Sequence, residues 1–177
     1  DTNTKPACRR IENALATSFR SKSQNGFVAI EAEHFYKAND ASEAKWAVIP
    51  THGRTKSAMS LMPYKASTEG ASIQYSFELP ENVSEVKVHI VTNSTLPFLR
   101  KEGHRYSVQI DDSQQVEVNY NGRYTEENQW EMYDIVATRV IETITPMTIA
   151  KGKTHTLTIR PIEPGMVLQK IVIDYGG

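Results

Sequence analysis

Apolar side chains alternate with polar ones over most of this 177-residue chain, and this alternation restricts the fold more than any other feature. Ile73, Tyr75, Phe77 and Leu79 are separated by single polar residues, which is the pattern of a β-strand that buries one face. The same pattern recurs along the chain and predicts about nine or ten strands. The clearest are residues 28–33, 58–62, 73–79, 86–90, 106–110, 116–118, 139–145, 156–160 and 167–173.

Two segments have helical spacing instead. Pro6 suits the first turn of a helix over residues 6–20, which a linker ending at Gly26 would follow. Asn128 is a suitable N-cap for a short helix inserted between two predicted strands. The apolar residues spaced for one face are Ile11, Leu15 and Phe19 in the first segment and Trp130, Tyr133, Ala137 and Val140 in the second. We expect Trp130 to pack against the sheet.

Together these elements predict an all-β fold: a two-sheet jelly-roll sandwich with an N-terminal helix and one short inserted helix. A closed barrel is the alternative architecture. The chain is long enough for one well-cored domain and too short for two. We therefore divide it into an N-terminal helix and linker over residues 1–25 and a β-sandwich domain over residues 26–177.

Charge and composition exclude several classes of function. The 20 Lys and Arg residues are balanced by 21 Asp and Glu residues, and no basic stripe predicts a nucleic-acid partner. No apolar run approaches the ~20 residues that cross a bilayer, so no membrane partner is expected. Cys8 is the only cysteine, which leaves neither an internal disulfide nor a thiolate zinc site. The first residues do not have the pattern of a signal peptide.

No catalytic motif stands out among the side chains that can do chemistry. The five histidines are scattered singly and are expected to face solvent; they are His34, His52, His89, His104 and His155. Glu31 and Glu33 lie two apart in a predicted strand, which puts their side chains on one face about 7 Å apart. That spacing suits the acid and base of an inverting glycosidase, and it equally suits a shared cation.

Several blocks of sequence carry a resemblance to a known family. They are residues 26–34 (GFVAIEAEH), 46–50 (WAVIP), 53–55 with 57–58, 93–98 (NSTLPF), 103–112 (GHRYSVQIDD) and 164–177 (PGMVLQKIVIDYGG). In this order they resemble the C-terminal domain of glycoside hydrolase family 115, the xylan α-glucuronidases. The resemblance implies a sandwich that is accessory to catalytic domains lying upstream and does no chemistry itself. It also implies a secreted or periplasmic location in bacterial-type polysaccharide degradation.

The first and last predicted strands also resemble those of galactose-binding-like carbohydrate-binding modules. In such modules, carboxylates of these two strands approach one another and often hold a structural calcium ion. Carried over, the resemblance implies a Ca²⁺ site made by Glu31, Glu33 and Asp174. The alternative is an acidic edge joined by hydrogen bonds, with no ion.

A sugar site needs aromatic faces and a few planar polar groups, and an arginine binds a uronate carboxylate through two hydrogen bonds. The predicted ligand-binding residues are Tyr120, Asn121, Arg123 and Tyr124 in one loop, and Trp46 and Arg54 in a second cluster. Strand alternation places Trp46 on one face with Val48, so burial in the core is the alternative for this ring.

Three functions are therefore consistent with the sequence. The first is a non-catalytic accessory domain that docks onto a catalytic domain or a second copy, or contacts carbohydrate. The second is an independent carbohydrate-binding module for an acidic xylan-type glycan such as glucuronoxylan. The third is a small glycosidase that uses Glu31 and Glu33.

Overall fold

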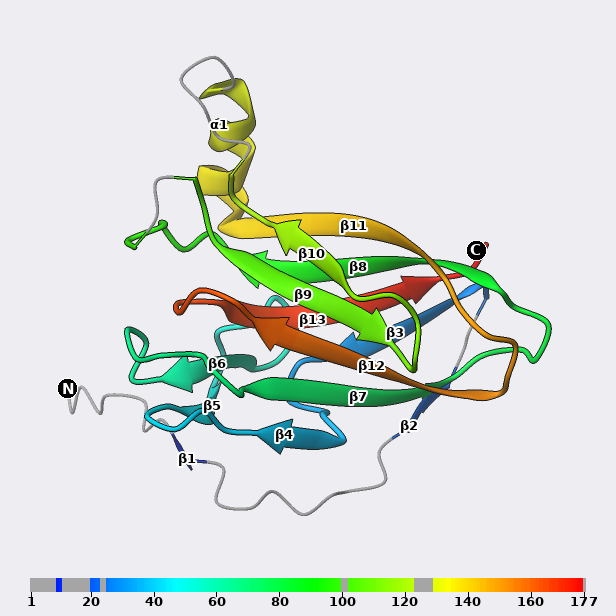
Figure 1. The fold of residues 1–177 in the computed structure, drawn as a ribbon. Coiled ribbons are helices and arrows are strands. Elements are labelled where there is room, and N and C mark those ends of the chain that lie inside the picture. The colour runs from blue at the N-terminus through cyan, green and yellow to red at the C-terminus, as the bar shows by residue number, and fades with distance from the viewer. Residues whose placement is uncertain (1–8, 11–19, 23–24, 100–101, 123–128, 177) are drawn as a thin grey trace.

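The computed structural model describes residues 9–10, 20–22, 25–99, 102–122 and 129–176, and in them two β-sheets pack face to face (Figure 1). Sheet A contains β1 (Arg9–Arg10), β3 (Phe27–Glu31), β5 (Lys45–Ile49), β6 (Ala58–Met62), β8 (Glu85–Asn93), β11 (Val140–Thr148) and β13 (Val167–Asp174). Sheet B contains β2 (Arg20–Lys22), β4 (Lys37–Asn39), β7 (Ser72–Glu78), β9 (Arg105–Ile110), β10 (Val116–Asn119) and β12 (Thr154–Pro161). Figure 1 views sheet B in front of sheet A.

The strand order confirms the predicted sandwich. Sheet A runs β1-β5-β6-β13-β8-β11, with β3 also paired to β13, and sheet B runs β10-β9-β12-β7-β2, with β4 also paired to β7. Apart from the pairs β5–β6 and β9–β10, neighbouring strands are not consecutive in sequence, and nearly all of them pair antiparallel. The last strand, β13, lies in the middle of sheet A and pairs with both β3 and β8. The strand that comes last in the sequence is therefore an interior strand of sheet A.

The apolar residues of the alternating pattern form the core between the two sheets. On β9, Tyr106 and Val108 are fully buried, and on the neighbouring β12 so are Leu157 and Ile159. Burying one such side chain contributes roughly 1.5–3 kcal/mol relative to leaving it exposed. Tyr75 also lies in this core, where burial raises the pKa of its hydroxyl well above 10.0. The hydroxyl stays neutral and donates a hydrogen bond of 2.9 Å to the carbonyl oxygen of Ala32.

The segment predicted as an N-terminal helix contains strand pairing where the structure describes it. Arg9 and Arg10 pair with β5, and β2, which begins at Arg20, runs parallel to β7. The helix prediction is wrong at these residues because unsatisfied sheet edges were available for them to pair with. Residues 11–19 lie outside the described part of the chain.

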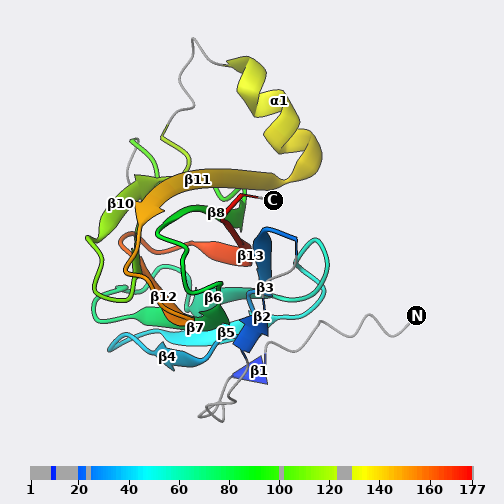
Figure 2. The same ribbon diagram turned by 90° about the vertical axis from the view of Figure 1, so that its right-hand side faces the viewer.

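The inserted helix is confirmed as α1 (Gln129–Thr138), although its packing differs from the prediction. It projects from the edge of the sandwich beside β11 (Figures 1 and 2). Tyr133 and Ala137 were expected to face the sheet, yet both are exposed, and Ile135 is the apolar residue that packs against the core. The side chain of Trp130 lies outside the described residues.

Candidate functional site

In the loop predicted to bind a ligand, residues 120–124, the side chains of Tyr120 and Asn121 are buried and hold neighbouring loops together. Tyr120 is 1% exposed, and its hydroxyl lies 3.1 Å from Nδ1 of His104 and 3.3 Å from Oγ1 of Thr95. Asn121, also buried, donates from Nδ2 to the Thr95 carbonyl at 2.8 Å and accepts from the backbone N–H of His104. Neither side chain presents a free face to a sugar, which corrects the expectation for both. Arg123 and Tyr124 lie outside the described residues.

Trp46 and Arg54 are not brought together as a cluster. Trp46 is 2% exposed, and its indole Nε1 donates to the Asn39 carbonyl at 3.0 Å, so the alternative of a core role replaces the predicted ligand contact. Arg54 is exposed on the loop between β5 and β6, where its backbone N–H donates to Oε1 of Gln169 at 2.9 Å. This loop belongs to sheet A, on the opposite layer from the polar face described below.

The three predicted calcium ligands are not brought together either. β3 ends at Glu31, and the chain turns there with the backbone N–H of His34 donating to the Glu31 carbonyl, so Glu33 leaves the strand. In the register of β3 with β13, Glu31 lies opposite Lys170 while Asp174 lies opposite Phe27. Four strand residues separate these positions, a distance of about 13 Å. Among the described residues, no group of three or more His, Cys, Asp or Glu side chains is placed to hold a metal ion.

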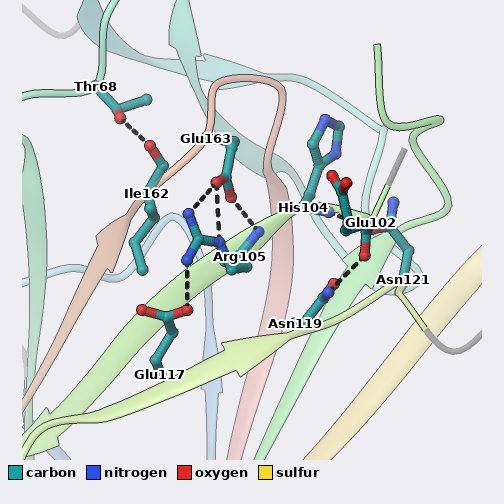
Figure 3. Close-up of polar contacts among 9 residues, drawn as sticks. All are labelled: Thr68, Glu102, His104, Arg105, Glu117, Asn119, Asn121, Ile162 and Glu163. Carbon is teal, nitrogen blue, oxygen red and sulfur yellow. Dashed lines mark hydrogen bonds and ion pairs between the residues drawn. The ribbon is translucent and has the colours of Figure 1, made fainter. Parts of the chain in front are cut away.

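Arg105 and Glu163 form the most extensive charged network at the end of sheet B (Figure 3). Glu163, which is buried, accepts from the backbone N–H of Arg105 at 2.7 Å, from its Nε at 2.9 Å and from its Nη2 at 2.5 Å. Nη1 of the same arginine donates to Glu117 on β10 at 2.6 Å. These hydrogen bonds raise the pKa of the Arg105 guanidinium further. The network fixes the end of β9, and Arg105 has few donors left for a ligand.

Two histidines that were expected to face solvent are buried. His155 points into the core from β12, with Nδ1 2.7 Å from Oδ2 of Asp111 and Nε2 2.9 Å from the Gly152 carbonyl. His104 is 0% exposed, and its ring packs edge-on against Phe98 with centroids 5.4 Å apart. Its Nε2 has no hydrogen-bond partner among the residues that the structure describes. The sequence contains no periodic signal for the burial of His104, because that burial depends on loops that fold over the residue.

The burial of His104 predicts a loss of stability in mild acid. Burial lowers the pKa of the imidazole from its ordinary 6.5, while the charge of Glu163 acts in the opposite direction. A histidine with a lowered folded-state pKa stabilises the fold fully above pH 6.5, and this contribution is lost as the pH falls from 6.5 through the folded-state pKa. Urea unfolding of the wild type and of His104→Phe at pH 7.5, 6.5 and 5.5 should show the wild type losing stability relative to the variant. A pH-independent difference would contradict this account.

The outer face of sheet B is lined by polar side chains, of which the smaller ones are buried among their neighbours. Tyr106, Val108, Leu157 and Ile159 face the core, so the residues between them on β9 and β12 face outward. The outward positions of β9, β12 and β7 are Arg105, Ser107, Gln109, Thr156, Thr158, Arg160, Ser72, Gln74 and Ser76. Hydrogen bonds link them across strands: Nε2 of Gln74 donates to Thr158 at 3.3 Å, and Nη1 of Arg160 donates to Oε1 of Gln109 at 3.1 Å.

Arg160 also lines a pocket of about 420 Å³ where this face meets the loop between β6 and β7. The pocket is lined by Ser67, Thr68, Glu69, Gly70, Ala71, Ser72, Arg160, Pro161 and Ile162. Oγ1 of Thr68 donates to the Ile162 carbonyl at 2.8 Å and so ties the loop to the end of β12 (Figure 3). No carboxylate of the described residues lies within ion-pair distance of Arg160. We refer to this hollow as the Arg160 pocket.

An exposed apolar group occupies the same end of the sandwich. Leu96 is 80% exposed and Leu99 is 59% exposed, on the loop that follows β8. Phe98, on that loop, meets Tyr64 edge-on with ring centroids 5.6 Å apart, and both rings are partly exposed. We call these four residues the loop-end patch. A contiguous exposed apolar surface is typical of an interaction site.

The comparison with known families agrees with the resemblance found in the sequence. The model described as "Glycosyl hydrolase family 115 C-terminal domain" matches residues 22–177. The chain belongs to this family. It is thus a non-catalytic accessory β-sandwich domain of the kind found in glycosyl hydrolases, as predicted. Among curated proteins, none matches the sequence. No helix of the described residues is long and apolar enough to cross a membrane.

Solved structures show the same fold for this family 115 C-terminal domain. BtGH115A, a family GH115 4-O-methyl-α-glucuronidase with specificity for decorated arabinogalactans, matches with a TM-score of 0.58 and 19% identity over 81% of this chain and 18% of its own. The C-terminal CBM6 of LamC, a laminarinase from Zobellia galactanivorans, matches with a TM-score of 0.54 and 14% identity, over 84% of this chain and 98% of the module. A family 35 carbohydrate-binding module from Clostridium thermocellum matches with a TM-score of 0.54 and 8% identity, over 83% of this chain and 96% of the module. The chain therefore spans less than a fifth of BtGH115A and nearly all of each binding module.

Proposed function

We propose that this accessory domain contacts an acidic, glucuronoxylan-type glycan through the Arg160 pocket, as part of a secreted or periplasmic polysaccharide-degrading protein. The observation that carries the proposal is a guanidinium with no carboxylate partner among the described residues, held in a pocket that hydroxyl groups line. A guanidinium binds a carboxylate through two parallel hydrogen bonds, which suits the carboxylate of a uronic acid. The structural relatives named as carbohydrate-binding modules are consistent with a glycan ligand.

The lining of the pocket can also bind the neutral part of a sugar. Ser67 carries a hydroxyl group, and Glu69 can accept hydrogen bonds from sugar hydroxyls. Gly70 has a φ of 79°, and a Cβ atom added there would meet nothing within 4 Å, so the backbone is open to an approaching ligand. The aromatic rings of Tyr64 and Phe98 lie at the same end of the sandwich and offer faces for stacking.

The glycosidase alternative is disfavoured by the environment of its two carboxylates. Glu31 lies 3.1 Å from the ammonium of Lys170, and Glu33 lies 3.8 Å from that of Lys56. A general acid sits in an apolar or like-charged environment, whereas each of these glutamates has a lysine ammonium beside it. These contacts support a structural role for both glutamates.

Replacing Arg160 with glutamine tests the proposed site. We expect the wild type to bind glucuronic-acid-decorated xylo-oligosaccharides more tightly than undecorated ones, because only the former carry a carboxylate. Arg160→Gln should weaken binding of the decorated ligand about 10- to 100-fold, the loss expected for hydrogen bonds to a charged group. Isothermal titration calorimetry measures both affinities.

Arg54→Gln is the matched control for this experiment. It removes an exposed arginine on a sheet A loop, away from the pocket, and also tests the ligand role predicted for Arg54 from the sequence. Binding should be unchanged in this variant. Equal wild-type affinity for decorated and undecorated ligands, or an Arg160→Gln variant that binds like the wild type, would refute the proposal.

The loop-end patch supports docking as a second candidate function. Its occupant would be either the body of the hydrolase or a second copy of this chain. The small share of BtGH115A that the chain spans is consistent with the first of these. Two exposed leucines beside an aromatic pair resemble the apolar centre of a protein interface more than a sugar platform.

A further inference from the structure

The carboxylate of Glu31, at the end of β3, is fully engaged by its neighbours. Oγ1 of Thr55 lies 2.7 Å from Oε1 and 2.8 Å from Oε2, and Nζ of Lys170 lies 3.1 Å from Oε1. The pair is partly shielded from water, with the Glu31 side chain 17% exposed and that of Lys170 28% exposed. Lys170 comes from β13, directly across the sheet from Glu31. The contact thus joins β3 to β13.

Glu33 is held in a similar way, by the same loop that supplies Thr55. Its Oε1 lies 3.8 Å from Nζ of Lys56, and its Oε2 accepts from the backbone N–H of Ser57 at 3.3 Å. The ring of His34 is also within 3.8 Å of Oε1. Each glutamate therefore has a lysine beside it, and the two lysines come from separate segments of the chain.

These contacts do not fit a calcium ion. Calcium takes six to eight oxygen ligands at about 2.3–2.6 Å, and a lysine ammonium is a donor with no lone pair to offer. An ammonium 3.1 Å from the carboxylate oxygen occupies the space in which a cation would be coordinated and repels a second positive charge. The register of β13 also leaves Asp174 about 13 Å along the strand from the position opposite Glu31.

We propose that the ammonium groups of Lys170 and Lys56 supply the positive charge at this acidic edge, so that the domain folds without a divalent metal. The acidic edge, for which the sequence resemblance implied a Ca²⁺ site, is held here by side chains of the chain itself. Glu31 and Lys170 stabilise the contact between β3 and β13, and Glu33 and Lys56 fix the loop over residues 50–57 against it.

Thermal unfolding of the wild type in EDTA and in excess CaCl₂ tests metal independence. The two melting temperatures should agree within about 1 °C, because a ligand stabilises a fold only by binding its native state. A melting temperature that falls by several degrees in EDTA and recovers with calcium overturns the proposal.

A double-mutant cycle tests the role of Lys170 independently of metal. Lys170→Met and Glu31→Gln should each lower the melting temperature by roughly 3–5 °C, and the double variant should lose clearly less than the sum. Lys45→Met removes an exposed lysine on β5 and should change the melting temperature by less than about 1 °C. Additive losses in the double variant, or a Lys170→Met variant that melts like Lys45→Met, also overturn the proposal.

Discussion

Replacing Glu163 with alanine is expected to lower the free energy of unfolding by about 2–4 kcal/mol. Glu163 is buried and accepts three hydrogen bonds from Arg105, one of them from the backbone N–H. Its removal leaves a backbone donor without its partner and a cation beside an empty space. At roughly 2–4 °C for each kcal/mol in a domain of this size, the melting temperature should fall by about 5–15 °C.

The other carboxylate on Arg105 provides the control. Glu117 binds Nη1 of the same guanidinium, yet its side chain is 54% exposed, so Glu117→Gln should cost less than about 1 kcal/mol. Glu163→Gln keeps an acceptor oxygen in place and should fall between the two. Urea unfolding of the three variants ranks them, and equal losses from Glu163→Ala and Glu117→Gln would show that burial is not what makes this network important.

The long strands could be predicted from the sequence because each buries one complete face. The prediction for residues 58–62 coincides with β6, and that for residues 167–173 differs from β13 only at its last residue. The short strands β1, β2 and β4 were not predicted. They contain two or three residues and are defined by the neighbour they pair with. Such pairing leaves no periodic pattern in a single sequence.

The candidate site was predicted less well, for a physical reason. The alternation identifies which strand residues face the core, but the burial of a loop residue depends on other loops. Tyr120 is buried because its hydroxyl bonds to His104 and Thr95, which come from a different connection. Arg160 had a usable signal, since it lies at an outward position of a predicted strand. Nothing in the sequence indicated that no carboxylate of the described residues would pair with it.

The role of Glu31 and Glu33 depends on where β3 ends. The predicted strand over residues 28–33 would have placed Glu31 and Glu33 on one face. The strand ends at Glu31 instead, because the chain turns back and Tyr75 and Gln169 take the next backbone groups. The acid–base, metal-binding and structural interpretations of the two glutamates can be told apart only once that turn is known.

Gly103→Ala is expected to be at least as damaging as the loss of Glu163, at about 3–5 kcal/mol. Gly103 has a φ of 116°, a conformation that residues with a side chain rarely adopt. A Cβ atom there would lie 2.7 Å from the backbone nitrogen of Gly122 and would also meet the side chain of Asn119. The backbone cannot move away without disturbing the contacts that hold His104 and Asn121 in place.

Gly70→Ala separates the two causes of that loss. Gly70 also has a positive φ, 79°, so its substitution adds backbone strain, but a Cβ atom there would meet nothing within 4 Å. Its cost should therefore be strain alone, about 1 kcal/mol. Chemical denaturation of both variants gives the difference, which measures how tightly the loops of residues 102–104 and 120–122 are packed. If the two variants lose the same stability, this packing is loose, and the burial of Tyr120 and His104 does not depend on a close approach of the two loops.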